Sequence, residues 1–357
     1  MNVGPFTRLL SVGFMSTLKL NRLPAIADVI QSYETVKKYA CHTPVLTSRS
    51  VNAMLHADLY LKCENFQRGG AFKFRGASNA VFNLTQEEAK RGVTTNSSGN
   101  HAAGLSLAAS MRGIPAYIVM PENAPAIKKK AVAGYGGKIT FCKPTQKDRE
   151  DTLDQVQNRT GAMFIHAYNN FNVICGQGTA SLELLGAHPD LDVVIAPVGG
   201  GGLLSGTLTY TKGFNPGIKV YGTEPLNADD AFRSLCDQRI YPSVNPETIA
   251  DGLRTALCKL TFDIISAKCD GILTVTEEGI ISAMRMIWER MKIIIEPSSA
   301  VPVAAIMEHP QFFAGKKVGV IISGGNVDLD DLPFKQSHQT FSPANKTETA
   351  LPKLHVT

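Results

Sequence analysis

The chain has 357 residues, with 36 lysines and arginines against 31 aspartates and glutamates, so its formal net charge is +5. Its 44% hydrophobic and 19% charged residues and its mean hydropathy of -0.02 exclude a disordered chain or a collagen-like fibre and are typical of a soluble globular protein. At roughly 150 residues per domain, the length predicts about two domains, and two lobes usually enclose a cleft. The 31 glycines need an explanation, because glycine serves where the backbone takes unusual dihedral angles or approaches a ligand closely.

Several classes of protein are excluded by simple patterns. No apolar run approaches the roughly 20 residues needed to cross a bilayer, so no integral membrane segment is expected. The seven cysteines are scattered and never form C-x-x-C, which predicts neither a disulfide framework nor a zinc site and indicates an intracellular protein. The densest basic run, Lys128-Lys129-Lys130, has no interleaved aromatic residues. We therefore expect no nucleic-acid partner.

The two ends differ from the rest of the chain. Residues 1–27 contain basic residues, and the first acid is Asp28, so this segment is either an N-terminal extension or a mitochondrial presequence. The location expected is therefore cytoplasmic or mitochondrial. Residues 335–357 are polar without apolar periodicity and are predicted to form a disordered tail.

Between the ends, short strand patterns alternate with longer helical patterns, which is typical of α/β architecture with parallel strands. The first strand is predicted at 59–63. A regular block follows, with strands at 93–95, 116–120, 138–142 and 163–166 and helices at 101–112, 125–133 and 148–158. A second series has strands at 193–196, 219–222 and 318–322 and helices at 178–185, 277–291 and 300–307. We infer a small parallel-sheet domain, residues 90–168, inserted in a large domain formed by residues 28–89 and 169–334.

Ligands of such sheets bind outside the carboxyl ends of the strands. The clearest signal there is the run Gly199, Gly200, Gly201, Gly202 and Leu203, between a strand and a helix. Exposed backbone N–H groups and the helix N-terminus predict a phosphate ligand. The run lacks the Lys-Ser/Thr of a nucleotide-binding loop and the G-x-G-x-x-G spacing of a dinucleotide fold, which argues against both.

Lys73 follows the first strand and lies between Phe72 and Phe74. Apolar surroundings lower the pKa of a lysine, and the neutral amine can form a Schiff base. An ordinary helix start is the alternative interpretation of this segment.

Two more strand ends carry small polar residues. Ser97, Ser98, Gly99, Asn100 and His101 offer hydroxyls, an amide and helix N-terminal N–H groups to a substrate carboxylate, although an ordinary N-cap is the alternative. Ser323 ends the last strand before two glycines, where a simple turn would also suffice.

In this order the motifs FKFRGASNA, SSGNHA, GQGT, PVGGGGLLSG, PETIADG, EPS and SGGNVD resemble those of the serine racemase and serine/threonine dehydratase family. The resemblance covers about residues 28–330. It implies a two-domain fold type II pyridoxal phosphate enzyme, similar to the tryptophan synthase β subunit. Such a fold has twisted, mainly parallel sheets flanked by helices, and its active site lies in the cleft between the large and small domains. A homodimer acting on a small amino acid is also implied.

By this resemblance, Lys73 beside Phe72 would carry pyridoxal 5'-phosphate and residues 199–203 would bind its phosphate. Asn100 would bond the ring hydroxyl, and Ser323 would face the pyridine nitrogen. A neutral serine does not keep that nitrogen protonated, so the ring withdraws electrons less strongly. This favours proton removal and β-elimination over transamination.

The resemblance also assigns Lys73 and Ser98 to opposite faces of the substrate. Racemisation needs an acid or base on each face, whereas dehydration needs one base and a protonated leaving group. Related threonine dehydratases often have alanine where Ser98 stands. We therefore predict a serine racemase with L-serine dehydratase activity, giving D-serine and pyruvate plus ammonia, with L-threonine as a further candidate substrate.

Two alternatives stay open. A dedicated L-threonine or 3-hydroxyaspartate dehydratase is one, because Tyr168 replaces the asparagine of animal serine racemases. A nicotinamide-dependent dehydrogenase shares the α/β pattern but not the dinucleotide fingerprint.

Further ligands follow from the same resemblance. The substrate-binding set is Ser97, Ser98, Gly99, Asn100, His101, Arg149 and Thr255. Glu224, the Ala228 carbonyl and Asp230 match a site for Mg²⁺ or Ca²⁺, which prefer hard oxygen donors. Helix N-capping is the alternative for the two acids.

A nucleotide site is matched only in part. Tyr135, Lys292 and Asn326 are retained from the ATP site of animal serine racemases. Arg68-Gly69 replaces a Lys-Thr pair, and Ala103 replaces a glutamine. These departures argue against activation by ATP.

Overall fold

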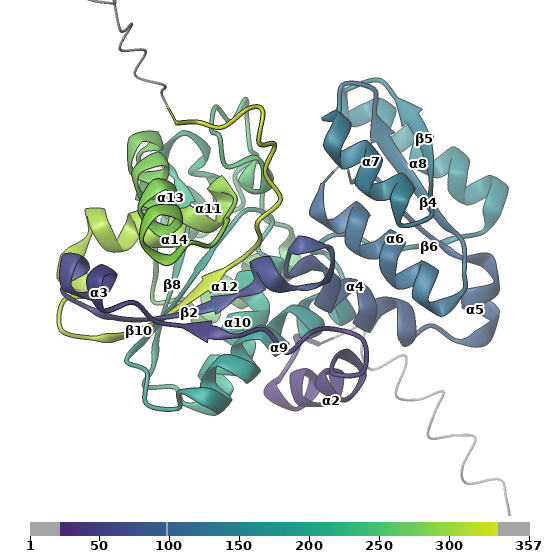
Figure 1. The fold of residues 1–357 in the computed structure, drawn as a ribbon. Coiled ribbons are helices and arrows are strands. Elements are labelled where there is room, and N and C mark those ends of the chain that lie inside the picture. The colour runs from purple at the N-terminus through teal and green to yellow at the C-terminus, as the bar shows by residue number, and fades with distance from the viewer. Residues whose placement is uncertain (1–21, 98, 335–357) are drawn as a thin grey trace, which may run out of the picture.

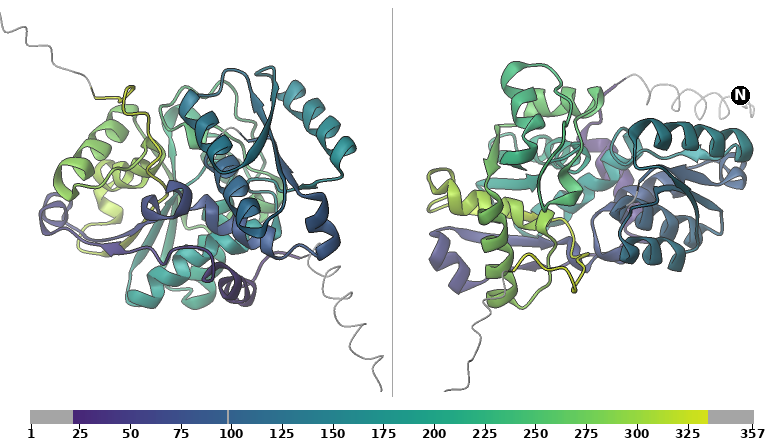
Figure 2. Two further views of the ribbon diagram at one scale, coloured as in Figure 1. Left: turned by 45° about the vertical axis from the view of Figure 1, so that its right-hand side comes forward. Right: turned by 90° about the horizontal axis from the view of Figure 1, so that it is seen from above.

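The computed structural model describes residues 22–97 and 99–334 (Figure 1). Ser98, the predicted tail 335–357 and the predicted N-terminal extension up to residue 21 lie outside the described residues. The strands form two separate sheets, one of six strands and one of four. The two sheets lie side by side in all views, each with its own helices (Figures 1 and 2).

The four-stranded sheet is entirely parallel, in the order β5-β4-β3-β6. Its strands are β3 (Val93–Thr95), β4 (Ala116–Pro121), β5 (Gly137–Cys142) and β6 (Met163–Phe164). Its helices are α6 (Asn100–Arg112), α7 (Ala126–Gly134) and α8 (Gln146–Thr160). Each predicted strand and helix of this block is confirmed, with ends that differ by at most two residues. Helix α8 begins earlier than predicted because the Thr145 hydroxyl accepts the backbone N–H of Asp148 at 3.1 Å.

The six-stranded sheet has the order β1-β2-β10-β7-β8-β9, and only β1 is antiparallel to its neighbour. Its strands are β1 (Val45–Leu46), β2 (Asp58–Cys63), β7 (Val193–Pro197), β8 (Lys219–Pro225), β9 (Gly271–Val275) and β10 (Lys317–Ile322). Because Cys63 pairs with Ile322, the carboxyl ends of β2 and β10 lie level. The first predicted strand therefore belongs to this sheet and not to the small one, as expected.

Two apolar clusters cover the faces of the large sheet. On one face lie α2 (Ile26–Val36), α9 (Phe171–Ala187), α10 (Gly202–Phe214) and α12 (Lys259–Lys268). On the other lie α3 (Arg49–Leu55), α13 (Glu277–Met291) and α14 (Pro297–Glu308). Helix α9 begins seven residues before its predicted start, because the Asn170 side chain accepts the N–H of Val173 at 3.0 Å and caps it.

Helix α4 (Lys73–Phe82) lies between the two sheets and packs on both α6 and α9 (Figure 1). Phe74, Ala77 and Val81 join the core of the small sheet. The strands of the small sheet all fall within residues 93–164, but α4 belongs to the packing of both lobes. The division into domains at residues 89/90 and 168/169 stays a prediction.

The other helical elements are short. They are α5 (Gln86–Arg91), α11 (Asp230–Asp237), η2 (Glu64–Phe66), η3 (Arg68–Gly70), η4 (Leu226–Ala228), η5 (Asp251–Leu253) and η6 (Pro310–Phe312). Within residues 22–97 and 99–334, no helix combines the length and the apolar character that crossing a membrane requires.

Candidate active site

Backbone pairing joins the segment before Lys73 to the end of β10. Ala71 and Gly324 form an antiparallel bridge, and the N–H of Phe72 donates to the carbonyl of Ser323 at 2.9 Å. The N–H of Gly325 donates to the carbonyl of Gly70 at 2.9 Å. Two segments far apart in the chain are thus fixed side by side at the carboxyl edge of the large sheet.

Lys73 is the first residue of α4. Its Nζ donates to the carbonyl of Ala167 at 3.3 Å and lies 5.0 Å from the centroid of the Phe72 ring. Burial lowers the pKa of Lys73 to about 8, and the nearby Glu296 carboxylate opposes this shift in part. An amine with this pKa is partly neutral near physiological pH, as a nucleophile or base requires.

The glycine run links β7 to α10 and leaves no room for side chains. A Cβ on Gly199 would lie 2.9 Å from the Cα of Leu253, and one on Gly200 would lie 2.3 Å from the Tyr168 ring. Gly201 has φ of 84°, the left-handed region that favours glycine. No side chain caps α10, so the N–H groups of its first turn lack partners within the helix. These residues fit a phosphate group.

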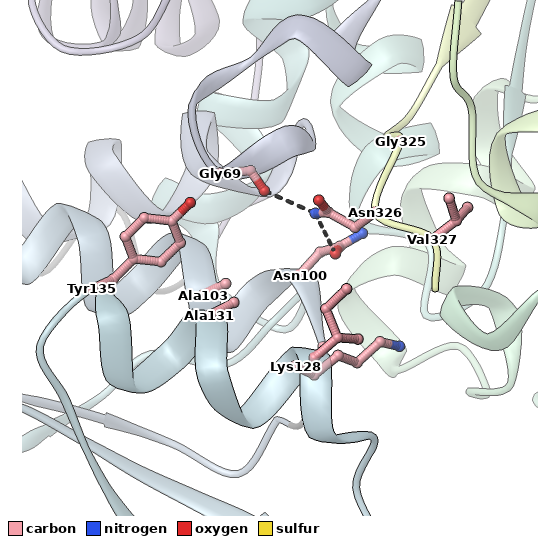
Figure 3. A pocket seen from close by; sticks show the side chains of 11 residues that line it. Gly69, Asn100, Ala103, Lys128, Ala131, Tyr135, Gly325, Asn326 and Val327 are labelled. Atoms are coloured by element: carbon pink, nitrogen blue, oxygen red, sulfur yellow. Dashed lines mark hydrogen bonds between the residues drawn. The ribbon is translucent and has the colours of Figure 1, made fainter. Parts of the chain in front are cut away.

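Asn100, at the start of α6, is held from both sides, and Figure 3 shows the side formed by Asn326 and Gly69. Its Nδ2 donates to the two carboxylate oxygens of Glu296 at 3.0 and 3.1 Å. Its Oδ1 accepts from the Nδ2 of Asn326 at 2.9 Å, and that Nδ2 also donates to the carbonyl of Gly69 at 2.8 Å. The orientation of the Asn100 amide is therefore fixed.

The sequence did not point to Glu296. This residue is 5% exposed, and burial together with the charge of Asp251 raises its pKa to about 7. The EPS motif contains this residue, but nothing in the motif indicates contact with Asn100, which lies on the other domain's helix.

Ser323 is buried at the end of β10, 2.9 Å from the hydroxyl of Ser299. Ser299 in turn bonds both the N–H and the carbonyl of Gly324, each at 2.7 Å. The position predicted to face a pyridine nitrogen therefore holds a neutral hydroxyl in a fixed network.

His101 faces the protein interior. Its Nε2 shares a 2.9 Å hydrogen bond with the carbonyl of Ile165, and because a carbonyl only accepts, the proton is on Nε2. Burial and the charge of Lys73 lower the pKa of His101 to about 3, so the ring is neutral. Its predicted contact with the substrate carboxylate stays a prediction, whereas its observed contact is structural.

His166 is a second histidine near Lys73, which sequence reasoning missed. Its Nδ1 accepts the N–H groups of Tyr168 at 3.2 Å and Asn169 at 2.9 Å. Burial and the charge of Lys73 lower its pKa to about 4. The neutral ring thus shapes the turn that presents the Ala167 carbonyl to Lys73.

Tyr168 packs against the glycine run from this turn, close to Gly200 and Gly202. Burial raises its pKa to about 12, and its hydroxyl interacts with Thr255, whose own hydroxyl lies beside Gly199. Thr255 is therefore next to the predicted phosphate site. Arg149 lies in α8, and its buried Nε has no hydrogen-bond partner among the described residues.

Glu224 and Asp230 form a second polar site at the end of β8. The carboxylate of Glu224 accepts the N–H groups of Ala231 at 3.1 Å and Phe232 at 2.9 Å. Both carboxylate oxygens of Asp230 are buried, and neither meets hydrogen-bond geometry with a described residue, although Ser243 lies near enough to lower its pKa slightly. Burial raises the pKa of Glu224 well above its ordinary value and that of Asp230 to about 6.

A cation would relieve both buried carboxylates. The described residues contain no group of three or more His, Cys, Asp and Glu side chains suited to a metal. A site here therefore needs a carbonyl, such as that of Ala228 in η4, beside the two acids. This donor set, all oxygen, fits Mg²⁺ or Ca²⁺.

A pocket that is open to solvent lies on the other side of Asn100 (Figure 3). Tyr135 and Asn326 line it, as do Gly69 and Ala103. Lys292 does not line it, and its Nζ donates to the carbonyl of Glu289 in α13. The structure therefore brings together two of the three residues retained from a nucleotide site.

The comparisons with known proteins agree with this geometry. Residues 36–324 match the family model described as pyridoxal-phosphate dependent enzyme, so the chain belongs to that family. The chain is 50% identical over 313 residues to serine racemase from Dictyostelium discoideum, covering 86% of this chain and 96% of the relative. It is 47% identical over 312 residues to beta-hydroxyaspartate dehydratase from Paracoccus denitrificans, covering 87% and 99%.

Solved structures give the same result. The structure of maize serine racemase aligns with a TM-score of 0.85 at 42% identity, covering 87% of this chain and 95% of that one. The threonine deaminase of T.th. aligns with a TM-score of 0.82 at 40% identity, covering 85% and 99%. The predicted fold type II architecture and pyridoxal phosphate as the cofactor are thereby confirmed.

Proposed function

We propose that this protein racemises serine and also eliminates water from L-serine, giving D-serine and pyruvate plus ammonia. The observation that carries the proposal is the 50% identity to a serine racemase over 96% of that protein's length. The arrangement of Lys73, Asn100 and Ser323 supports it, because the segment that contains Ser323 pairs with the residues before Lys73 and bonds Asn100 through Asn326. Bound pyridoxal phosphate supplies an electron sink that makes the α-proton of an amino acid acidic.

The cofactor would be held at both ends. The backbone of residues 199–203 and the first turn of α10 would bind its phosphate. The Nδ2 of Asn100 would donate to the ring hydroxyl in place of one of its two hydrogen bonds to Glu296. The hydroxyl of Ser323 would meet the ring nitrogen without protonating it.

Lys73 would move the α-proton on one face. Its amine, with a pKa of about 8, is basic enough to accept a proton and neutral often enough to do so. The Ala167 carbonyl accepts a hydrogen bond from this amine and orients it. Ser98 would return a proton from the opposite face, which inverts the α-carbon.

Elimination uses the same base but needs no proton donor on the opposite face of the substrate. Lys73 takes the α-proton, the β-hydroxyl leaves with a proton as water, and the unsaturated product hydrolyses to pyruvate and ammonia. The substrate carboxylate would bind at the N-terminus of α6, where Gly99 provides no side-chain cap and leaves backbone N–H groups available. Thr255 and Arg149 complete the proposed substrate contacts.

A divalent cation, Mg²⁺ or Ca²⁺, would be held by Glu224, the Ala228 carbonyl and Asp230. The orphaned oxygens of Asp230 support this assignment. A homodimer and an intracellular location, cytoplasmic or mitochondrial, are also proposed, on the resemblance and the basic N-terminus. Activation by ATP is not part of the proposal, because Gly69 and Ala103 replace the expected polar side chains in the cavity.

A dedicated 3-hydroxyaspartate dehydratase is the second candidate. Tyr168 favours it, since its ring fills the space beside Gly200 and its hydroxyl lies near Thr255. The 47% identity to a beta-hydroxyaspartate dehydratase supports the same interpretation.

The two candidates are separated by their products. Chiral amino-acid analysis and keto-acid release are measured for L-serine, L-threonine and 3-hydroxyaspartate, with the parent protein, Ser98→Ala and Ser110→Ala. The exposed Ser110 lies on α6, the helix that follows Ser98 in the chain, and serves as the control. We expect Ser98→Ala to lose D-serine formation by about 100-fold or more while elimination continues. Equal loss of both activities would refute the role of Ser98. Turnover of 3-hydroxyaspartate without any D-serine from the parent would replace the racemase with the second candidate.

A further inference from the structure

Four charged side chains are buried together beneath helix α4, outside the site described above. They are Lys62 in β2, Glu64 in η2, Arg75 in α4 and Glu183 in α9, here called the buried charge cluster. Lys62, Glu64 and Arg75 are 0% exposed, and Glu183 is 5% exposed. Buried charges are costly unless they are paired and fully hydrogen-bonded, so this arrangement needs an explanation.

Arg75 is the centre of the cluster. It bonds Glu64 through Nε at 2.6 Å and Nη2 at 2.8 Å, and it bonds Glu183 through Nη1 at 2.8 Å and Nη2 at 2.7 Å. Lys62 Nζ donates to Glu183 Oε2 at 2.6 Å and to the carbonyl of Thr43 at 2.6 Å. Every carboxylate oxygen accepts at least one hydrogen bond. Two cations and two anions leave the cluster with no net charge.

The cluster acts on the helix that begins with Lys73. Arg75 lies two residues after Lys73, in the first turn of α4, and its backbone N–H bonds the carbonyl of Phe72 at 2.9 Å. On the same side α4 approaches α9 so closely that a Cβ on Gly176 would lie 2.7 Å from the carbonyl of Arg75. Rotation of α4 would break both contacts. The cluster and this close approach therefore fix the direction in which Lys73 leaves the helix.

Few charges surround the amine of Lys73 itself. Glu296 faces it from the start of α14, His101 from α6 and His166 from the turn after β6. Both histidines are neutral, because burial and Lys73 lower their pKa values to about 3 and about 4. On the far side, Tyr33 of α2 is the titratable group that feels the charges of Arg75 and Glu183. An unbalanced charge in the cluster would act on Lys73 through weakly screening surroundings.

We propose that the buried charge cluster is a positioning device for Lys73. Arg75 fixes the first turn of α4. Because the two carboxylates balance the two cations, the Lys73 amine is held in place without a net electrostatic effect of the cluster on its pKa. The inference rests on the proposed role of Lys73 as the residue that carries the cofactor. It makes the four charged residues positioning residues, since none of them reaches the cleft.

The test changes the net charge of the cluster in both directions in the holoenzyme. Glu183→Gln leaves a net charge of +1, Lys62→Met leaves −1, and the double variant restores neutrality. The first readout is the pH dependence of the rate at which cyanoborohydride reduces the Schiff base. Hydride adds to the imine carbon only when the nitrogen is protonated. The second readout is the pH dependence of kcat for the lysine-dependent steps.

We expect shifts of opposite sign. Glu183→Gln should move both midpoints to lower pH by about half to one unit, because a nearby positive charge disfavours a protonated nitrogen. Lys62→Met should move them to higher pH by a similar amount, and the double variant should return them to the parent values. Glu64→Gln also leaves a net charge of +1 in the cluster, and it is used in place of Glu183→Gln if that variant does not fold.

Asp270→Asn provides the matched control. Asp270, whose side chain is 16% exposed, pairs with Lys212 at 2.6 Å and Lys219 at 2.9 Å, at the amino end of the large sheet. The Asp270→Asn variant should lower the melting temperature without moving the midpoint of either pH profile. Shifts of one sign in all variants, or shifts that follow only the loss of melting temperature, would overturn the inference. Reduced cofactor found by mass spectrometry on a lysine other than Lys73 would instead refute the proposed function.

Discussion

The two buried carboxylates at the end of β8 predict a pH-dependent loss of stability that a divalent cation removes. The pKa of Asp230 is raised from 3.8 to about 6 by burial, so the folded protein binds this proton more tightly than the unfolded chain. Stability is therefore highest below about pH 4 with respect to this group and falls as the pH rises to about 6. The rise in pKa corresponds to about 3 kcal/mol of unfolding free energy.

The assay is calorimetric unfolding of the holoenzyme at about pH 5 and about pH 7.5, in a chelator and in excess Mg²⁺ or Ca²⁺. In the chelator, the parent should lose about 1.4 kcal/mol relative to Asp230→Asn between the two pH values, which is about half of the full effect because much of it falls below pH 5, or on the order of 2 to 5 °C in Tm. Cation should restore the parent and leave Asp230→Asn unchanged. Asp237→Asn, an exposed acid on the same helix, is the control and should behave as the parent. A parent Tm that does not respond to cation, or an equal response in Asp230→Asn, would refute the reasoning.

Three further predictions concern the cofactor site. Gly200→Ala should weaken pyridoxal phosphate binding by at least 10-fold in a fluorescence titration, since its Cβ would lie 2.3 Å from the Tyr168 ring. The control Gly186→Ala, where nothing lies within 4 Å of the added Cβ, should bind the cofactor normally. Equal affinities in the two variants would contradict the role of the glycine run in binding the phosphate. Lys73→Ala should lose the visible Schiff-base absorbance and both activities, and a variant that keeps the colour would show that another lysine carries the cofactor. The elimination rate should rise with pH as the Lys73 amine, with a pKa of about 8, loses its proton; a rate that falls between about pH 6.5 and pH 8 would exclude a neutral amine as the base.

Much of the cofactor site could be predicted because its residues follow strands directly. The glycine run after β7, Asn100 after β3 and Ser323 after β10 are local patterns, and ligands of parallel sheets bind at such carboxyl strand ends. The helices and strands of the small sheet could likewise be predicted from the periodicity of apolar residues within each segment. These features need no knowledge of distant contacts.

The remaining features depend on contacts that no local pattern shows. Lys62 stands in the strand Asp58–Cys63 as an ordinary polar residue among apolar ones, yet it is fully buried because Glu183, 121 residues away, pairs with it. Glu296 acquires its role from Asn100 across the two lobes. Strand β9 was missed because its edge position leaves only two of its five residues buried, so its hydrophobic pattern is weak.

The central claim is that Lys73 and a second group on the opposite face exchange the α-proton of serine. Incubation of the holoenzyme with L-serine in D₂O, followed by chiral separation and mass spectrometry, tests it most directly. We predict D-serine that carries one solvent deuterium at Cα from the first turnover, and none from Lys73→Ala. Pyruvate without D-serine, or D-serine that retains the original hydrogen, would contradict the two-face racemase.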